Sequence, residues 1–582
     1  MKTGKTIKEN FDFAFENHKK NNLKIAEETY KQILDIDPNH FQSTVLLGTL
    51  SAQKKNFDLA KKLLQKAIHI NPNYAETHYN LGLVFNELND FQKAISCYKK
   101  AIEINPNYPD AYNNFGNCLK ELEDFDEAIN CYEKAININP NYADAYNNLG
   151  VIFKKLAKDE KAINCYEKTI KLQPNHIGAY YNLGKAFGDL GEEAKAINCY
   201  KKAIEINPNY ADAYNNLGTC YKVQGDFKNA ILNYELAVKS KPENLSYFYP
   251  LSELKNEILD SNLKNNVEKI INNKECNNQN LAFGNFLLAR FESKEKCYEK
   301  ELDYLIKGHK YFFEFKKAKF NRQLRYWLDD LPQVSKSSDY NSFNIINDKI
   351  KPIFIVGVPR CGSTLVEKII ASGSKPIPIG EETSLLHKFI MKKHNLSNFK
   401  NEDFNKMVLE EYRQKSLIQE KNDYVFTDKS LENFFYIGLI KKTFPNAKVI
   451  NCNRNVSSSI MSIMKNNLVE VPWAHDIKNI FKYFNIYHEI ILHFDKIYPG
   501  FIYHLNYEKL VIEPEKESKK LMEFCNLPWD EKCLEFYKRK DLISKTASNI
   551  QIREAIYKNS AEKYLPYKFF LNQHGLKYSW YN

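Results

Sequence analysis

The sequence predicts an α-solenoid followed by an α/β domain with a parallel sheet and a phosphate-binding loop. The solenoid is indicated by a 34-residue period that runs through residues 1–245. The α/β domain is indicated by the apolar run Ile353–Val356, which leads into a glycine-containing loop and then a helical pattern. Residues 246–347 keep a helical pattern and end in the polar segment 335–347, so we expect a helical capping and linker region there and the α/β domain over 348–582.

Three small or helix-breaking residue types mark the repeat. Proline recurs at Pro38, Pro72, Pro106, Pro140, Pro174, Pro208 and Pro242; glycine at Gly48, Gly82, Gly116, Gly150, Gly184 and Gly218; alanine at Ala26, Ala60, Ala94, Ala128, Ala162, Ala196 and Ala230. Glycine and alanine let two amphipathic helices approach closely, and proline interrupts the chain between units. The pattern resembles the tetratricopeptide repeat in about seven copies, the first with Ala14 at the glycine position. Stacked repeats of this kind form a superhelix with a concave face.

Four cysteines share the same period. They are Cys97, Cys131, Cys165 and Cys199. Stacked helices lie roughly 8–10 Å apart, which is too far for a disulfide, so we expect free packing thiols in a reducing compartment. The first residues carry no apolar signal segment, and no window approaches 18 consecutive apolar residues. We therefore expect a cytoplasmic protein without a membrane span.

An asparagine precedes the repeat glycine by two residues in five units. These are Asn80, Asn114, Asn148, Asn182 and Asn216. In superhelices that resemble the one in O-linked N-acetylglucosamine transferase, an asparagine here lines the groove and bonds the backbone of a bound peptide. An amide both donates and accepts, so it suits a peptide of any sequence. The alternative is a solvated consensus residue in an asparagine-rich chain.

The net charge of +11 is unevenly distributed. Residues 1–242 carry 31 Lys, no Arg and 30 Asp+Glu, so the remaining 340 residues hold 52 basic and 42 acidic residues. Such an excess fits either a solvated surface or an anionic ligand such as a nucleotide or a sulfated donor. No dense basic stripe, zinc spacing or recognition-helix pattern indicates nucleic-acid binding, and no ligand cluster indicates a metal.

The loop at residues 357–364 combines a preceding strand and a following helix, the arrangement that holds phosphate on backbone N–H groups. Its glycines, Gly357 and Gly362, have the spacing of the nucleoside triphosphatase loop, but Ser363 stands where that loop has lysine. No strand that ends in a magnesium-binding aspartate follows. Hydrolysis of ATP and a nucleotide kinase are therefore disfavoured, and a donor with a 5′-phosphate that carries another group is favoured.

The segment GVPRCGSTLVEKIIASGSKPIPIGEET at 357–383 resembles the 5′-phosphosulfate loop of sulfotransferases, above all protein-tyrosine sulfotransferases and bacterial tetratricopeptide-repeat sulfotransferases. Further segments resemble the family in order: 427–429, 444–454, 504–514 and 548–553. The resemblance covers about residues 350–570. It departs at Asn455 and Ser457, where an acidic residue and often arginine stand in the family, and at Cys361, where serine is common.

The resemblance implies the donor 3′-phosphoadenosine 5′-phosphosulfate and a set of binding residues. The loop residues Arg360, Cys361, Gly362, Ser363 and Thr364 would hold the 5′-phosphosulfate, Arg454 and Ser462 the 3′-phosphate, Tyr507 would pack near the adenine, and Lys563 would belong to the closing C-terminal segment. Lys429 and Ser548 would neutralise charge on the leaving oxygen. Surface ion pairs are the alternative for Arg454 and Lys429.

The family assigns the base that deprotonates the acceptor hydroxyl to Glu382. A rival base is His387, about one turn further along, because other sulfotransferase groups use histidine. A carboxylate that only favours a helix dipole is the remaining interpretation of Glu382.

Two functions remain. The first is a sulfotransferase that acts on a hydroxyl of a protein, peptide or glycan, with the superhelix binding the acceptor or a partner. The second is a peptide-binding scaffold with an inactive nucleotide domain. Joint retention of Arg360, Glu382, Lys429, Arg454 and Ser462 favours the enzyme. Tyrosine, a sugar and a lipid head group all stay open as acceptors, and the sequence does not fix the oligomeric state.

Overall fold

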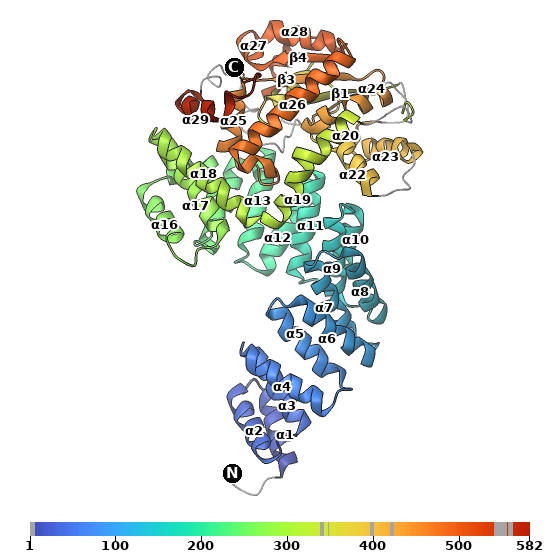
Figure 1. Ribbon diagram of the computed structural model, residues 1–582, viewed down its shortest axis with the longest axis vertical. Coiled ribbons are helices and arrows are strands. Elements are labelled where there is room, and N and C mark those ends of the chain that lie inside the picture. The colour runs from blue at the N-terminus through green and yellow to red at the C-terminus, as the bar shows by residue number, and fades with distance from the viewer. Residues whose placement is uncertain are drawn as a thin grey trace. The chain divides into compact units, whose positions relative to one another are not determined.

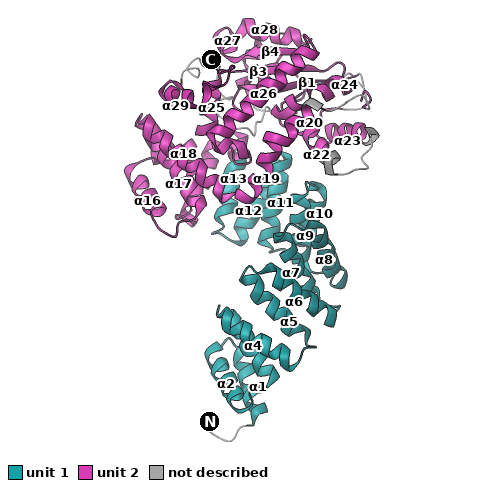
Figure 2. Ribbon diagram, viewed as in Figure 1, with its two compact units in different colours: residues 1–220 teal, residues 221–582 magenta. Residues whose placement is uncertain are grey.

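The computed structural model describes residues 6–337, 343–346, 349–395, 401–418, 424–539, 556 and 563–581 (Figure 1). This part of the chain divides into two compact units, residues 1–220 and 221–582 (Figure 2). No helix within the described ranges is long and apolar enough to cross a membrane.

Helices α1–α14 follow the 34-residue period of the sequence. Their bounds are α1 (Ile7–Lys19), α2 (Leu23–Ile36), α3 (Phe41–Gln53), α4 (Phe57–Ile70), α5 (Ala75–Glu87), α6 (Phe91–Ile104), α7 (Pro109–Glu121), α8 (Phe125–Ile138), α9 (Ala143–Lys155), α10 (Asp159–Leu172), α11 (Ile177–Leu190), α12 (Glu193–Ile206), α13 (Ala211–Gln224) and α14 (Phe227–Ser240). The two helices of a repeat pack on each other, as α5 does on α6. The predicted solenoid is confirmed.

The repeat glycine is required because the second helix of the unit places a ring against it. A Cβ on Gly82 would lie 2.5 Å from Cε1 of Tyr98, and a Cβ on Gly116 would lie 2.8 Å from Cε1 of Tyr132. Both tyrosines are fully buried. The glycine row therefore sets how closely the two helices of a repeat approach.

The four periodic cysteines are free thiols, as predicted. Cys131 is buried, and burial raises the pKa of its thiol to about 12. Burial likewise raises the pKa of Cys97 to about 11. Thiols with such pKa values stay protonated and act as small apolar packing groups.

The second unit is built on a parallel sheet of four strands within the described residues. The strands are β1 (Ile350–Gly357), β2 (Tyr424–Asp428), β3 (Lys448–Asn453) and β4 (Ile502–Asn506), in the spatial order β2-β1-β3-β4. All three neighbouring pairs are parallel. β2 lies on one side of β1, and β3, the next strand in the sequence, lies on the other side. The direction in which successive strands are added to the sheet therefore reverses at β1. Ligands of open parallel sheets bind at such a switch point, at the carboxyl ends of the strands.

Helices precede, cover and follow the sheet. The longer ones are α15 (Phe248–Leu254), α16 (Ser261–Ile271), α17 (Asn278–Lys294), α18 (Tyr298–Phe315), α19 (Lys317–Arg325), α20 (Leu331–Ser337), α21 (Ser363–Ala371), α22 (Leu385–Asn395), α23 (Asn401–Gln414), α24 (Ile437–Thr443), α25 (Val456–Lys465), α26 (Ile477–Ile497), α27 (Tyr507–Ile512), α28 (Pro514–Phe524) and α29 (Lys568–Gly575). Short turns are η1 (Leu245–Tyr247), η2 (Asn256–Ile258), η3 (Tyr326–Asp330), η4 (Leu431–Tyr436), η5 (Pro472–His475), η6 (Glu531–Leu534), η7 (Phe536–Lys538) and η9 (Leu565–Tyr567).

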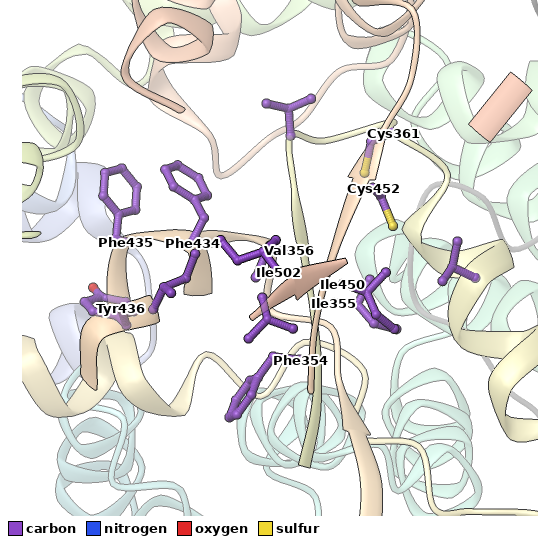
Figure 3. Close-up of a cluster of buried hydrophobic side chains, with 14 of the residues drawn as sticks. Phe354, Ile355, Val356, Cys361, Phe434, Phe435, Tyr436, Ile450, Cys452 and Ile502 are labelled. Atoms are coloured by element: carbon purple, nitrogen blue, oxygen red, sulfur yellow. The ribbon is translucent and has the colours of Figure 1, made fainter. Parts of the chain in front are cut away.

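One hydrophobic core joins the sheet to the helices on either side of it in sequence. It contains Leu328 and Leu331 from before the sheet, Phe354 and Ile450 from the strands, and Leu571 from α29. Figure 3 shows part of this core, with the aromatic residues of η4 beside the strands. Ser335, at the start of the segment interpreted as a linker, is buried in α20 and donates to the Phe435 carbonyl at 2.7 Å. The first residues of that segment are thus packed against η4.

Candidate active site

Each of the four strands delivers site residues at its carboxyl end. The phosphate loop follows β1, and Lys429, Arg454 and Tyr507 are the first residues after β2, β3 and β4. Because the strands are parallel, these four ends meet along one edge of the sheet. The fold therefore gathers residues that lie 150 positions apart in the sequence, from 357 to 507.

The phosphate loop has two positions with a left-handed backbone before helix α21. Gly362 has φ +95° and is the N-cap of α21, and Arg360 has φ +70°. A Cβ on Gly362 would lie 2.2 Å from Cδ2 of Tyr507, so glycine is required both by the backbone and by the ring. Gly362 has no side chain with which to cap α21. The N–H groups of its first turn are therefore positioned to bind an anion.

Cys361 differs from its prediction as a donor-binding residue. Its side chain is fully buried, and its backbone N–H donates to the Val358 carbonyl at 3.2 Å. The side chains of Cys361 and Cys452 lie beside each other near the ends of the strands (Figure 3). A Cβ on Gly357 would lie 2.8 Å from Sγ of Cys361. Cys361 thus supports the loop from the core side.

Two arginines and a serine meet beside the loop. Nε of Arg360 donates to Oγ of Ser462 at 2.9 Å, and Nη1 of Arg454 donates to the Arg360 carbonyl at 2.9 Å. The Arg454 guanidinium also lies 5.0 Å from the centre of the Tyr507 ring. Arg360, predicted for the 5′-phosphosulfate, therefore lies beside Arg454 and Ser462, predicted for the 3′-phosphate.

The two departures from the family pattern after Arg454 have structural roles. Asn455 is the N-cap of α25, and its side chain accepts from the Ser458 N–H at 2.9 Å. Asparagine caps a helix about as well as aspartate does. Ser457 is buried and donates to the Tyr581 hydroxyl at 3.1 Å. The replacement of an acidic residue at 455 therefore keeps α25 capped.

Glu382 and Lys429 form an ion pair at the end of β2. Oε1 of Glu382 lies 3.2 Å from Nζ of Lys429, and the side chain of Glu382 is 53% exposed while that of Lys429 is fully buried. Burial alone would lower the pKa of Lys429, but the carboxylates of Glu382, Glu367 and Glu381 outweigh it and raise the pKa above its usual value. Lys429 is thus a permanent buried cation beside an accessible carboxylate.

The segment before Glu382 is held along β2 by backbone hydrogen bonds. Thr427 N–H donates to Pro378 O, Gly380 N–H to Thr427 O, and Lys429 N–H to Glu381 O. A Cβ on Gly380 would lie 2.2 Å from Thr427 O, so only glycine allows this approach. Glu381 and Ser384 have φ of +48° on either side of Glu382 and Thr383. Strained backbone of this kind persists where the surroundings fix it, and it gathers at functional sites.

Two buried carboxylates, Glu367 and Asp428, hold this segment in place, and neither was predicted from the sequence as a site residue. Oε1 of Glu367 accepts from Thr427 Oγ1 at 2.8 Å and from the Glu381 N–H at 3.2 Å. Asp428 accepts from Thr383 Oγ1 at 2.6 Å and from Ser430 Oγ at 2.7 Å. Burial raises the pKa of both carboxyl groups. The sequence does contain a signal for Glu367, because it stands inside the apolar run of α21 and a buried carboxylate needs hydrogen-bond partners.

His387, the rival base, lies in α22 and is engaged by other side chains. Its Nδ1 lies 2.7 Å from the Tyr436 hydroxyl, and its ring stacks on Trp327 with centroids 4.9 Å apart. Burial lowers the pKa of His387 to about 4. It is therefore a neutral packing residue whose Nδ1 already has a partner.

Two further predicted residues have no contact with the site among the described residues. Ser548, with the segment 548–553, lies outside the described residues. Lys563 is exposed in the turn before η9. Within the described ranges no three His, Cys, Asp or Glu side chains form a group that could hold a metal.

The asparagine row of the repeats makes a ladder of hydrogen bonds between units. Each Nδ2 donates to a side chain of the preceding repeat: Asn80 to Thr49 at 3.2 Å, Asn114 to Tyr79 at 2.9 Å, Asn148 to Asn113 at 3.0 Å, Asn182 to Asn147 at 3.1 Å and Asn216 to Tyr181 at 3.2 Å. An amide has two N–H groups and a carbonyl oxygen, so each such bond uses only part of its capacity. The ladder thus fixes the orientation of the amides.

Comparison with known families separates the two parts of the chain. A model of the sulfotransferase family matches residues 352–531. Models of the tetratricopeptide repeat match residues 48–88, 116–156 and 189–225, residues 75–108, 143–176 and 211–244, and residues 97–130. The sulfotransferase match contains the loop, Lys429, Arg454 and Ser462, and the repeat matches lie within residues 48–244.

Two proteins are similar to this chain, each over a different length. An uncharacterized protein of Aquifex aeolicus (strain VF5) is 32% identical over 329 residues, which are 52% of this chain and 42% of that protein. Protein-tyrosine sulfotransferase 1 of Danio rerio is 26% identical over 217 residues, 33% of this chain and 57% of that protein. The chain spans about half the length of these relatives.

Solved structures of repeat proteins are similar to the repeats. One is MamA, at 31% identity and a TM-score of 0.27 over 28% of this chain and 97% of that one. Another is YrrB, titled a TPR protein with an unusual peptide-binding site, at 24% identity and a TM-score of 0.28 over 32% of this chain and 95% of that one. The family models thus show a sulfotransferase-family domain at residues 352–531, with tetratricopeptide repeats before it in the same chain.

Proposed function

We propose that the protein transfers a sulfuryl group from 3′-phosphoadenosine 5′-phosphosulfate to a hydroxyl group. The acceptor is a tyrosine of a protein or peptide, or a sugar of a glycan, and the repeats bind the acceptor or a partner that presents it. The observation that carries the proposal is the pairing of Glu382 with the buried Lys429 at the same sheet edge as the phosphate loop.

The donor fits the groups at this edge. The uncapped N-terminus of α21 would bind the 5′-phosphosulfate through backbone N–H groups, with Ser363 and Thr364 at the first two helical positions. Arg454 and Ser462 would bind the 3′-phosphate, which ATP lacks. Arg360 contacts both residues and would link the two anion sites.

The chemistry then needs one base and one buried cation. The acceptor oxygen forms a bond to sulfur while the bond from sulfur to the bridging phosphate oxygen breaks. Glu382, whose carboxylate is half exposed, would take the acceptor proton. Lys429 would stabilise the negative charge on the departing oxygen, and because it is already charged and buried it needs no rearrangement.

The contacts of His387 favour Glu382 as the base. Nδ1 of His387 contacts Tyr436, and the face of its ring is covered by Trp327. Glu382 contacts only the cation with which it would act, as far as the described residues show.

The repeats would deliver the acceptor through the asparagine ladder. In Asn148 and Asn182 the amide nitrogen donates to the neighbouring repeat, and the carbonyl oxygen would accept a peptide N–H. YrrB, a repeat protein similar to this part of the chain, is described as having a peptide-binding site. A pre-oriented row lowers the entropy cost of binding an extended peptide.

The test is to incubate the full chain with sulfur-labelled donor and a lysate of its own cells, and then to identify the labelled molecules. Label in a protein tyrosine or a glycan, lost in Lys429→Met, supports the proposal. Donor binding without transfer to any hydroxyl acceptor would instead establish the scaffold with an inactive domain.

A further inference from the structure

The C-terminal end of α25 is held by helices that precede the sulfotransferase domain in sequence. Glu301 and His309 of α18 reach it, and Lys316, which follows α18, reaches the segment after α25. They contact Lys465, the Met464 carbonyl and the Val469 carbonyl respectively, at 2.8, 2.7 and 2.8 Å. We name these three residues the α18 clasp. The clasp contacts a helix that also carries Ser462.

His309 makes the most buried of these contacts. Its Nε2 lies 2.7 Å from the Met464 carbonyl, and its Nδ1 lies 3.0 Å from Nδ1 of His475, which in turn has Nε2 3.2 Å from the Leu468 carbonyl. Both imidazoles are buried, and burial lowers the pKa of His309 to about 4 and that of His475 to about 3. The pair is therefore uncharged near neutral pH.

A carbonyl oxygen only accepts, so the three contacts need three N–H donors, and two neutral imidazoles supply two. The 2.7 Å contact between His309 Nε2 and the Met464 carbonyl is the shortest of the three, and we take it to hold the proton of His309. His309 thus donates to Met464, in the last turn of α25, where helix carbonyls lack intrahelical partners.

Glu301 holds the same helix end through charge. Its carboxylate is 3 Å or less from two partners, Nζ of Lys465 at 2.8 Å and the Tyr567 hydroxyl at 2.5 Å. The Glu301 side chain is 3% exposed and that of Lys465 is 32% exposed, so this ion pair is partly shielded from solvent. The clasp therefore fixes the last two residues of α25 by one buried hydrogen bond and one partly buried ion pair.

Ser462 lies two residues before Met464 and three residues before Lys465, on the same helical turn. Its hydroxyl accepts from Nε of Arg360, and its carbonyl accepts from Nδ2 of Asn466 at 2.7 Å. A shift of the end of α25 would move Ser462 with it, because one helical turn is rigid on this scale. The other end of α25 is fixed by the Asn455 cap.

We propose that His309 and Glu301 are positioning residues for the 3′-phosphate of the donor, so that the helices before the sheet tune donor recognition by the sulfotransferase domain. The inference rests on the proposed function and extends it: the 3′-phosphate site is completed from outside residues 352–531. The two residues act through α25 and Ser462 and do not touch the donor themselves.

Matched substitutions at one position separate positioning from simple stability. In His309→Gln, the amide nitrogen takes the place of Nε2 and keeps a donor toward Met464. In His309→Asn, the amide takes the place of Nδ1 and loses that donor. Asp303→Asn is the control on the same helix, because in the described part of the chain Asp303 pairs with the exposed Lys307, at 2.6 Å.

The measurement is calorimetric binding of adenosine 3′,5′-bisphosphate and of adenosine 5′-monophosphate to the full chain. His309→Asn and Glu301→Gln should weaken the bisphosphate about five- to tenfold, the size expected for one misplaced hydrogen bond, and should leave the monophosphate unchanged. His309→Gln and Asp303→Asn should bind both as the wild type does. Thermal unfolding of each variant verifies that it is folded.

A double-mutant cycle tests the route through Ser462. On a Ser462→Ala background, His309→Asn should weaken the bisphosphate no further, since the group that it positions is gone. Equal losses for both nucleotides, or full additivity with Ser462→Ala, would overturn the positioning role. Failure of the wild type to prefer the bisphosphate would instead reject the proposed function.

Discussion

Nζ of Lys429 lies 3.2 Å from Oε1 of Glu382, although 46 residues separate them in the sequence. The pair exists because residues 378–381 run beside the end of β2 and the backbone of Lys429 donates to Glu381 O at 2.7 Å. One member is buried and the other accessible. That asymmetry suits a fixed cation for the leaving oxygen and a base that an incoming hydroxyl can reach.

Replacement of Lys429 by methionine should remove the buried charge and keep the packing volume. We expect kcat to fall about 10²- to 10³-fold, the range seen when one stabilising group of a transition state is lost. The donor KM should change much less. Steady-state kinetics check this, with Lys442→Met, an exposed lysine of α24, as the control. Near-normal turnover of Lys429→Met would remove the residue from the reaction.

Glu382→Gln and His387→Asn together decide which residue is the base. Glu382→Gln keeps the shape and loses the proton acceptor, so we expect kcat to fall about 10²- to 10⁴-fold with donor affinity unchanged. His387→Asn retains a partner for Tyr436 at the Nδ1 position and should keep most of the activity. The opposite ranking of the two variants would transfer the role to His387.

Gly362→Ala should abolish donor binding and destabilise the domain. The new Cβ would meet the Tyr507 ring at 2.2 Å and the residue would keep φ +95°. Gly500→Ala is the matched control, because Gly500 also has a positive φ, +75°, but its Cβ would meet nothing within 4 Å. The control should cost about 1 kcal/mol of unfolding free energy from the backbone alone. Similar losses of unfolding free energy in the two variants would show that the contact with the Tyr507 ring is unimportant.

The second unit should lose stability as the pH falls below about 6.5. Burial lowers the pKa of His309, His387 and His488 to about 4 and that of His475 to about 3, whereas in the unfolded chain each starts near 6.5. Below that pH the unfolded chain binds more protons than the folded one. The unfolding free energy should therefore fall by about 1.4 kcal/mol per pH unit for each histidine, down to about pH 4.

Tryptophan fluorescence during urea unfolding measures this effect in the second unit, because all 4 Trp residues lie in it: Trp327, Trp473, Trp529 and Trp580. His309→Gln should show a shallower dependence on pH than the wild type. An unfolding free energy that stays constant between about pH 7 and about pH 5 would contradict the neutral state of these histidines.

Removal of the ladder amides should weaken binding of the acceptor and leave binding of the donor unchanged. For the paired variant Asn148→Ala with Asn182→Ala, we expect a higher KM for a peptide acceptor and an unchanged donor KM, because both amides lie in the repeats. Asn141→Ala, at an exposed turn, is the control. An unchanged acceptor KM would assign the ladder to holding adjacent repeats together.

The regular parts of the fold could be predicted from sequence because they repeat or alternate in short windows. The 34-residue period placed the repeat helices, and the run before Gly357 placed β1 and the loop. The grouping of Arg360, Arg454 and Ser462 could be predicted because parallel strands end at one edge. Here local pattern and topology agree.

Other parts of the site depend on contacts between segments that lie far apart in the sequence, so no short stretch of sequence contains both partners. The role of Glu367 comes from Thr427 and Glu381, and that of His309 from Met464 and His475. Cys361 occupies a motif position, yet the orientation of its side chain is decided by Gly357 and Cys452. Such pairings follow from tertiary packing alone.

The central claim is most directly tested by a purified reaction of the full chain with sulfur-labelled 3′-phosphoadenosine 5′-phosphosulfate and an acceptor recovered from the lysate experiment. The measured quantities are labelled acceptor and adenosine 3′,5′-bisphosphate. We predict that both form in equal amounts with the wild type and that neither forms at a comparable rate with Glu382→Gln. Release of the bisphosphate without labelled acceptor, or equal rates for the two proteins, would contradict the account.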